Sequence, residues 1–351
     1  MNSLSTLDLH NVAPTRNLPP LPLLEHDRDD DYILRIDNSS LEKLQTCPRS
    51  AEHYLIHRRE RAGSSALIFG GAIHAALEHL YKNNFSPEHI AEAIRIGHRH
   101  METINLRPHD HRTPQMLSQV ITLYAAQYAP HGGHDLIPLT YESSPAVEIG
   151  FSRQLGEMHL DSSMKFTRGR LLGMNCERPD EPLYIKTLHV LWSGKIDLIC
   201  DYMGKPVVAD HKTSSMAGPT FYEQFRLSQP VHGYMWAAAQ CMGISISTFM
   251  LNALFIRKPT KTGKGIEFER RTFNYSEFHM NEWEKDVTAE IGNFVNGMLS
   301  GYFPKAPVWC MGKYGACPYH DVCTQPGKDA QMSLLFSEIY SNVNWSPLNE
   351  D

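Results

Sequence analysis

The chain has 351 residues, 42% of them hydrophobic and 21% charged, which is typical of a folded protein with one large domain or two modest ones. Its net charge of −6 excludes a surface coated with basic residues for non-specific binding to nucleic acid, but not a local basic groove. The sequence contains no apolar run of about 18 residues and no basic and apolar leader, so we expect a cytoplasmic protein without a membrane span.

The first predicted elements are an arm and a set of helices. Residues 1–31 contain four prolines and an acidic run without hydrophobic periodicity, and we expect them to form a mobile arm. A helical N-terminal region is expected from residue 32 to residue 134. Its first helix begins at the Ser39–Ser40 pair, either of which can cap it, and a second helix opens after the Gly70–Gly71 pair. Further helices are expected over residues 86–129.

After residue 134 the pattern changes to alternating strands and helices. Short strands are predicted at residues 146–151, 184–192, 195–200, 205–210, 247–257 and 266–273. Helices are predicted at residues 229–242 and 276–299. The expected fold class is therefore α/β, with a mixed-sheet core over residues 135–299 between helical flanks. A cysteine segment (residues 300–326) and a tail (residues 327–351) follow the core.

Two aspartates and a lysine are expected on one face of the core sheet. Asp210 and Lys212 lie two positions apart at the end of the apolar run 207–209, and side chains two apart in a strand point to the same face. A hairpin turn around residues 201–205 would bring Asp197 beside them. Carboxylate oxygens suit Mg²⁺ or Mn²⁺, and the lysine would face the attacking water. The structural alternative is a set of surface ion pairs at strand ends.

The order of these motifs resembles that of the PD-(D/E)XK nuclease superfamily, and in particular its RecB-like exonuclease branch. The matching residues are His74 after the glycine pair, Glu148 on an earlier strand, Asp197, and the triplet Asp210-His211-Lys212. The resemblance implies a restriction-endonuclease-like core that binds a divalent metal. Its ligands would be His74, Asp197, Asp210 and the main-chain carbonyl of His211. The resemblance also implies that Lys212 orients or activates the attacking water and that Glu148 is an auxiliary acidic ligand.

The same branch carries a Gln-x-x-x-Tyr motif on a helix near the active site. Tyr234 matches the tyrosine of this motif, and we expect it to belong to the catalytic group. The candidate glutamine, Gln229, lies one residue further from Tyr234 than the motif requires. Either the helix starts later than usual, or Gln229 is not the equivalent residue.

Four of the seven cysteines bracket most of the chain. Cys47 lies near the start, and Cys310, Cys317 and Cys323 lie near the end, separated by gaps of six and five residues. Reduced thiolates bind zinc or iron–sulfur clusters, but this chain lacks the tight Cys-x₂₋₄-Cys pair of most structural zinc sites. By resemblance, these four cysteines match those that hold a 4Fe–4S cluster, which would join the two helical flanks. Zinc and free thiols remain the alternatives.

The resemblance spans about residues 39–323 and implies a Mg²⁺- or Mn²⁺-dependent deoxyribonuclease, an exonuclease on single-stranded DNA or DNA ends. Relatives of this kind act in recombination, repair or CRISPR adaptation, in a bacterial cytoplasm or a phage-infected cell, and some form homo-oligomers. One alternative is a non-catalytic DNA-binding or assembly protein that keeps the fold and the cluster. A zinc-stabilised interaction domain and a sequence-specific endonuclease are the others.

Two basic clusters and several aromatic residues are candidates for DNA contacts. The basic residues lie at positions 58–61 and 257–264, and the aromatic residues are Tyr54, Phe69, Phe221 and Tyr222. Basic side chains would contact phosphates, and aromatic rings would stack on unpaired bases. A solvated helix face and a solvated hairpin are the alternatives.

Overall fold

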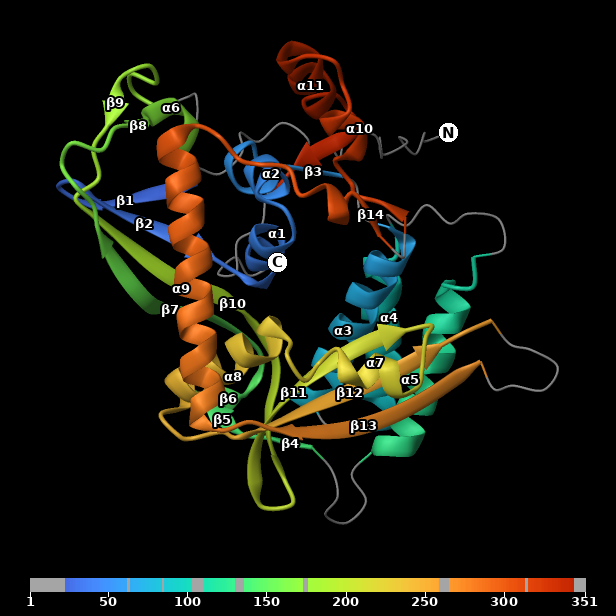
Figure 1. Ribbon diagram of the computed structural model, residues 1–351. Coiled ribbons are helices and arrows are strands. Elements are labelled where there is room, and N and C mark those ends of the chain that lie inside the picture. The colour runs from blue at the N-terminus through green and yellow to red at the C-terminus, as the bar shows by residue number, and fades with distance from the viewer. Residues whose placement is uncertain are drawn as a thin grey trace, which may run out of the picture.

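The computed structural model describes residues 23–61, 64–83, 85–102, 110–129, 136–172, 176–258, 265–312 and 315–343. Its centre is an eight-stranded mixed sheet with helices on both faces (Figure 1). The strands are β1 (Leu24–Arg28), β2 (Asp31–Ile36), β4 (Ile137–Pro138), β7 (Val147–His159), β10 (Thr187–Tyr202), β11 (Lys205–Ser214), β12 (Thr248–Ile256) and β13 (Ile266–Asn274). Their order is β1-β2-β10-β11-β12-β13, and β4 and β7 pair along the other edge of β10. The predicted α/β class with a mixed sheet is confirmed.

The long strand β10 divides the sheet into two halves. Along one edge it pairs in parallel with β2 as far as Trp192, and then in antiparallel with β11 from Leu198 onward. Residues 193–197 on this edge pair with neither strand, because β2 ends at Ile36 and β11 diverges from β10. We call this opening between β2 and β11 the fork. Because no neighbouring strand pairs with this edge of β10 at the fork, the main-chain groups and side chains there can contribute to a site.

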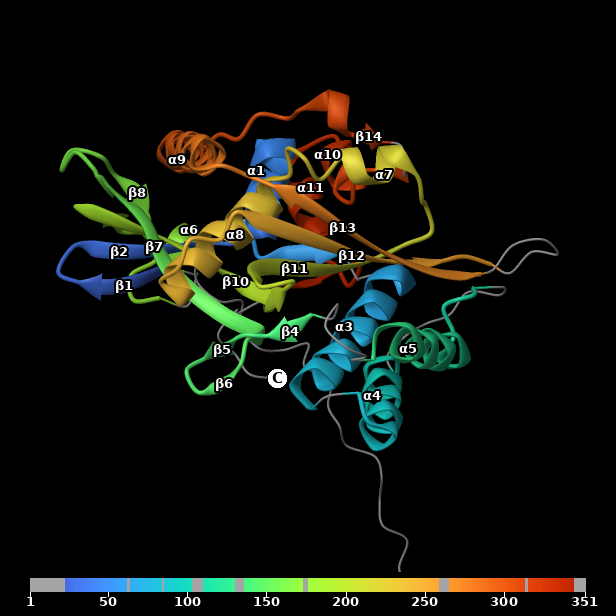
Figure 2. The ribbon, with the colours of Figure 1, turned by 90° about the horizontal axis from the view of Figure 1, so that it is seen from below.

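Helices cover both faces of the sheet, and each face has its own hydrophobic core. On one face lie α1 (Asn38–Thr46), α8 (Gln229–Met242) and α9 (Glu277–Ser300), and on the other lie α3 (Ser65–Asn83), α4 (Pro87–His100) and α5 (Pro114–Tyr128) (Figure 2). Alternate residues of β11 enter different cores, since Val208 packs with the first group and Val207 and Ala209 with the second. The helices predicted at residues 229–242 and 276–299 are confirmed.

Two predicted helix starts are wrong. The carboxylate of Asp37 accepts the main-chain N–H of Ser40 at 2.7 Å, so Asp37 is the cap and α1 begins before the serine that was expected to cap it. The Gly70–Gly71 pair lies inside α3, not at its start. Gly70 keeps α3 close to β11, because a Cβ atom there would lie 3.3 Å from Thr213 Oγ1.

One prediction about strands is also wrong. The strands expected at residues 184–192 and 195–200 form the single strand β10, because Ser193 and Gly194 continue the pairing with β7. Ser193 Oγ lies 2.9 Å from Ser152 Oγ, so the polar residue is satisfied within the sheet.

The mobile arm predicted over residues 1–31 is wrong for its last part, since β1 and the first residue of β2 belong to the sheet. Residues 1–22 lie outside the described residues.

The N-terminal and C-terminal flanks contact each other directly. β16 (Tyr340–Asn342) pairs in antiparallel with β3 (Arg59–Arg61), and Arg49 Nε donates to the carbonyl of Phe303 at 2.9 Å. The helices α10 (His320–Cys323) and α11 (Lys328–Leu335) complete the C-terminal flank. Residues 328–343, expected to form a tail, therefore fold onto the N-terminal flank.

The remaining elements are α2 (Pro48–Ala51), the π-helical turn η1 (Glu52–Ile56), β5 (Thr140–Tyr141), β6 (Ser144–Pro145), β8 (Phe166–Thr167), α6 (Arg168–Leu172), β9 (Pro182–Leu183), α7 (Pro219–Glu223), the 3₁₀ turn η2 (Pro307–Trp309), β14 (Met311–Gly312) and β15 (Gly315–Ala316). Among the described residues, no helix combines the length and the apolar character needed to cross a membrane.

Candidate active site

Asp197, Asp210 and Lys212 meet at the fork. Asp197 Oδ2 accepts a hydrogen bond of 2.7 Å from the main-chain N–H of His211, which joins β10 to β11 beyond their last paired residues. Lys212 Nζ lies 2.9 Å from each carboxylate oxygen of Asp210. Asp197 and Asp210 are buried, with 9% and 3% of their surface exposed. The predicted hairpin therefore brings both carboxylates and the ammonium group to one place.

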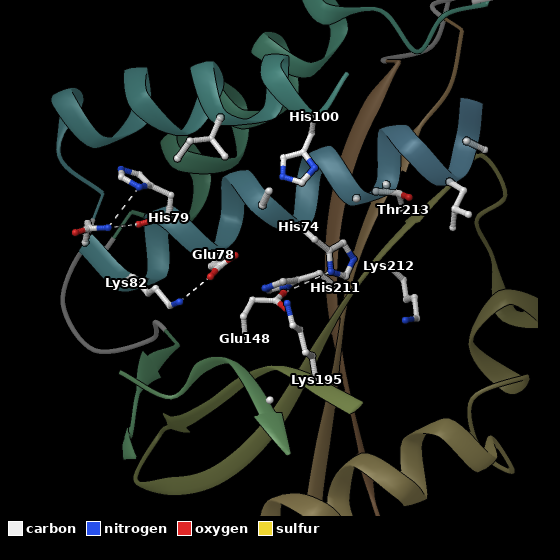
Figure 3. Close-up of a pocket in the computed structure, with 18 of the residues that line it drawn as sticks. His74, Glu78, His79, Lys82, His100, Glu148, Lys195, His211, Lys212 and Thr213 are labelled. Atoms are coloured by element: carbon white, nitrogen blue, oxygen red, sulfur yellow. Dashed lines mark hydrogen bonds and ion pairs between the residues drawn. The ribbon is translucent and has the colours of Figure 1, made fainter. Parts of the chain in front are cut away.

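Two more of the predicted residues reach the fork from other elements. His74 extends from α3 and Glu148 from β7 (Figure 3). His74 Nδ1 lies 3.4 Å from Asp197 Oδ2 and 3.9 Å from Glu148 Oε1. One ligand atom from each of these three residues lies within 4.8 Å of the other two, and we call these residues the ligand group. Asp210 is not among them, because both of its oxygens face Lys212.

The backbone at Glu148 explains how a strand residue can join this group. Its φ of +52° lies in the left-handed region, which residues other than glycine rarely adopt and which costs about 1–3 kcal/mol. The conformation breaks the usual alternation, since Val147 packs in the core beneath α3 and Ile149 packs in the core on the opposite face. Glu148, between them, is directed toward His74 instead of following either neighbour.

The charged groups at the fork shift one another's pKa values, and the shifts differ in direction from group to group. Burial raises the pKa of Asp197, but His74, His211 and Lys212 outweigh this effect and hold it well below its usual value. Burial raises the pKa of Asp210 to about 6, although Lys212 opposes the shift. For His74, burial lowers the pKa, but the carboxylates of Asp197 and Glu148 outweigh burial and raise it well above 6.5. The two neighbouring carboxylates therefore favour the protonated form of the His74 imidazole.

The fork opens into a cleft of about 1370 Å³ between α3, α4 and the strands β7, β10 and β11. Glu148, His211 and Lys212 line its floor together with Lys195, which points toward Glu148 (Figure 3). Lys195 was not predicted to be a functional residue. Its position two residues before Asp197 on the same strand was the available signal, because residues two apart share a face. Lys195 adds a positive charge to the cleft.

A sequence model of the PD-(D/E)XK nuclease superfamily matches residues 38–324. The chain belongs to this superfamily. The match covers the strands from β4 to β13, the site residues at the fork and all four cysteines of the predicted cluster, whereas β1 and β2 precede it. Among solved structures, a "putative exonuclease" from Eubacterium rectale matches 84% of this chain and 89% of its own, with 11% identity and a TM-score of 0.45. No curated protein matches the sequence.

The residues at the fork fit the divalent metal that PD-(D/E)XK nucleases use. Carboxylate oxygens, which Asp197 and Glu148 supply, are the preferred ligands of Mg²⁺ and Mn²⁺. The imidazole nitrogen of His74 is a ligand for transition metals such as Mn²⁺. The main-chain carbonyl of His211 faces the same edge of β11 as its N–H group, because the two groups of one strand residue point to the same side. That N–H donates to Asp197, so the carbonyl is directed into the fork as well.

Metal affinity should depend steeply on pH, because a cation must displace the proton of His74. We expect the affinity for Mn²⁺ to rise about tenfold per pH unit below the raised pKa of His74, with release of one proton. Calorimetric titrations at several pH values, in buffers of different ionisation enthalpy, would measure both quantities. In His74→Gln the proton release should disappear above pH 7, where Asp210, with its pKa of about 6, is already ionised. Equal Mn²⁺ affinity of the unchanged protein at pH 6 and pH 8 would contradict this prediction.

The structure places Tyr234 near the fork and leaves Gln229 at a helix end. Tyr234 lies on α8, where burial raises its pKa while the charge of nearby Lys212 opposes the shift. Gln229 is the first residue of α8, and its Oε1 atom is buried without a hydrogen-bond partner among the described residues. Tyr234 is thus close enough to act on Lys212, whereas in the described part of the chain no hydrogen bond or ion pair links Gln229 to the fork.

The four predicted cluster cysteines gather between the two flanks. The main-chain N–H of Ala306 donates to Cys47 Sγ at 3.4 Å, and Cys310 Sγ lies 3.9 Å from the carbonyl of Ala306. Burial, and then the neighbouring thiols of Cys47 and Cys310, raise the pKa of Cys317. Burial also raises the pKa of Cys323, with Cys47 and Cys317 adding to the effect. The thiols of the four cysteines therefore lie near enough to one another to affect each other's pKa.

Most of the proposed DNA contacts are wrong. Tyr54, Phe69, Phe221 and Tyr222 are between 2% and 8% exposed and belong to the hydrophobic cores. Arg59 donates to the carbonyls of Leu335 and Ser337 and therefore holds the flanks together. Arg257 pairs with Glu267 on β13, and Lys261 and Lys264 lie outside the described residues. Arg61 and Lys258 of these clusters are exposed and remain candidates, and Lys195 is a further exposed lysine in the cleft.

Proposed function

We propose that this protein is a Mg²⁺- or Mn²⁺-dependent deoxyribonuclease of the RecB-like iron–sulfur branch, acting as an exonuclease on single-stranded DNA or DNA ends. The observation that carries the proposal is the convergence of the ligand group with Asp210 and Lys212 at the fork, inside one open cleft. The preference for single strands and ends rests on the family resemblance. So does a place in recombination, repair or CRISPR adaptation.

In this proposal the metal ligands are His74, Asp197, Glu148 and the carbonyl of His211, with Asp210 as a further ligand. A divalent cation, when bound, lowers the pKa of a water molecule and neutralises charge on the phosphate. Lys212 is fixed by both oxygens of Asp210, so its ammonium group is positioned to orient the attacking water. Tyr234 supports Lys212 from α8.

We also propose that Cys47, Cys310, Cys317 and Cys323 hold a 4Fe–4S cluster. Sulfur ligands of one zinc ion lie about 3.8 Å apart, given Zn–S bonds of about 2.3 Å and tetrahedral geometry. Among the described residues, no three of these cysteines bring their sulfurs within 4.8 Å of one another. The wider arrangement favours a cluster over zinc. Either metal centre would add to the flank contacts already described.

The experiment that tests the proposal uses protein purified without oxygen. Its visible spectrum and its iron, sulfide and zinc content identify the metal centre. The same sample is then incubated with Mn²⁺ and two single-stranded DNAs of equal length, one linear and end-labelled and one circular. Cleavage of the linear DNA alone supports an exonuclease, whereas cleavage of both indicates an endonuclease. Iron-bearing protein that binds but never cleaves DNA would favour the non-catalytic binder.

A further inference from the structure

The side chain of His211 lies on the opposite face of β11 from Asp210 and Lys212. Its ring stacks on Tyr81 of α3 at 5.6 Å between centroids, and its Nδ1 atom lies 2.7 Å from Asn252 Nδ2. His211 is only 2% exposed, and it lines the cleft. The family resemblance assigns a role to its main-chain carbonyl alone, so the ring needs a separate explanation.

A row of polar residues crosses three strands behind this ring. His211 on β11 is in register with Asn252 on β12, and Asn252 is in register with Arg270 on β13. Asn252 Nδ2 also donates to Tyr124 Oη at 2.7 Å, and Arg270 donates to the hydroxyls of Tyr81 and Tyr124 at 3.1 and 3.3 Å. Burying these polar groups costs free energy unless they are hydrogen-bonded, and the bonds above offset most of that cost, although Asn252 Oδ1 and Arg270 Nε have no partner among the described residues. The contacts with Asn252 and Tyr81 hold the His211 imidazole in one orientation.

The network also determines which nitrogen carries the proton. Asn252 Nδ2 is a donor, so Nδ1 of His211 accepts, and the neutral imidazole carries its proton on Nε2. Nε2 has no hydrogen-bond partner among the described residues, and His211 is not a member of the ligand group. The ring therefore presents an N–H donor on the edge away from Asn252, at the wall of the cleft that also holds His74 (Figure 3).

We propose that His211 Nε2–H donates a hydrogen bond to a phosphate oxygen of the DNA strand in the cleft, making the side chain a substrate contact. This inference rests on the proposed nuclease function. A neutral donor held in place by a rigid network loses little entropy on binding, which suits it to position a strand. The backbone hydrogen bond from His211 to Asp197 does not involve the ring, so a side-chain change can spare the ligand group.

Two variants separate this role from a structural one. His211→Leu removes the donor, and His211→Gln restores an N–H donor on a side chain of similar reach. We expect His211→Leu to lower kcat/KM, and to weaken binding of a fluorescent single-stranded DNA, by about tenfold or more. His211→Gln should recover most of the loss. Mn²⁺ affinity measured without DNA should stay within about twofold of the unchanged protein for both variants.

His189→Leu serves as a control, because His189 is also a histidine on a strand, partly rather than fully buried, and lies beside Asp27 and Glu157, away from the cleft. Equal DNA affinity of His211→Leu and the unchanged protein would overturn the proposal. Equal losses in both His211 variants together with weaker Mn²⁺ binding would also overturn it, by indicating a structural role. If the unchanged protein binds DNA without cleaving it, the nuclease proposal fails, and the difference in DNA affinity still decides the His211 contact.

Discussion

Replacing Lys212 with alanine is expected to lower the cleavage rate by about 10²–10⁴-fold while the protein stays folded. The ammonium group is the only cation within hydrogen-bonding distance of Asp210 in the described part of the chain, and it lies 2.9 Å from both oxygens. Its loss removes the group that orients water. It also removes the positive charge that opposes the rise in the pKa of Asp210. The pKa of this carboxyl should therefore rise further, from about 6 to a higher value.

Lys205→Ala is a suitable control for this variant, because Lys205 is an exposed lysine at the start of the same strand. Both proteins should melt at similar temperatures, and only Lys212→Ala should lose cleavage of end-labelled DNA in Mn²⁺. A rate equal to that of the unchanged protein, in a preparation free of host nucleases, would refute the assigned role of Lys212. Raising the pH should restore part of the activity that Lys212→Ala has lost, since Asp210 then regains its negative charge.

Replacing Cys47 or Cys323 with alanine is expected to remove the metal centre and to lower the melting temperature by on the order of 10 °C or more. The large effect follows from the distance along the chain between Cys47 and the C-terminal cysteines. A link between such distant segments restricts the unfolded chain far more than the folded one. Scanning calorimetry and iron analysis of each purified variant would measure the two losses.

Cys176→Ala provides the control for the cysteine variants, since Cys176 is a partly exposed thiol outside the proposed cluster. It should retain both the iron content and the melting temperature of the unchanged protein. An unchanged melting curve for Cys47→Ala and Cys323→Ala would mean that the direct flank contacts, such as the pairing of β3 with β16, are sufficient without a cluster. Zinc in place of iron would favour the alternative metal centre.

The sequence predicted the parts of the site that depend on local periodicity. Asp210 and Lys212 share a face because strand residues alternate, and the short turn at residues 203–204 forces Asp197 onto the neighbouring strand. The helix predicted at about residues 229–242 has those bounds in the structure, where Gly243, in the left-handed region, ends it. Strand alternation and the hairpin turn therefore gave the right result, whereas the local rules for helix starts failed at α1 and α3.

Features that depend on distant contacts could not be predicted in this way. The direction of Glu148 results from a left-handed backbone that its neighbours in two different cores impose. The pairing of both Asp210 oxygens with Lys212 depends on the orientation of two side chains, which spacing along the strand does not determine. The row from His211 to Arg270 depends on the register of three strands, which no spacing in the sequence reveals.

The pairing of β3 with β16 has a consequence for the synthesis of the protein. Residues 59–61 leave the ribosome long before residues 340–342, their partners in the two-stranded sheet. The N-terminal flank must therefore wait, with Arg59 and the thiol of Cys47 unpartnered, while the whole sheet is translated and folds. The proposed cluster ligands are complete only once Cys323 has been synthesised, so the proposed cluster would be inserted after the residues that line the cleft, 64–213, have been made.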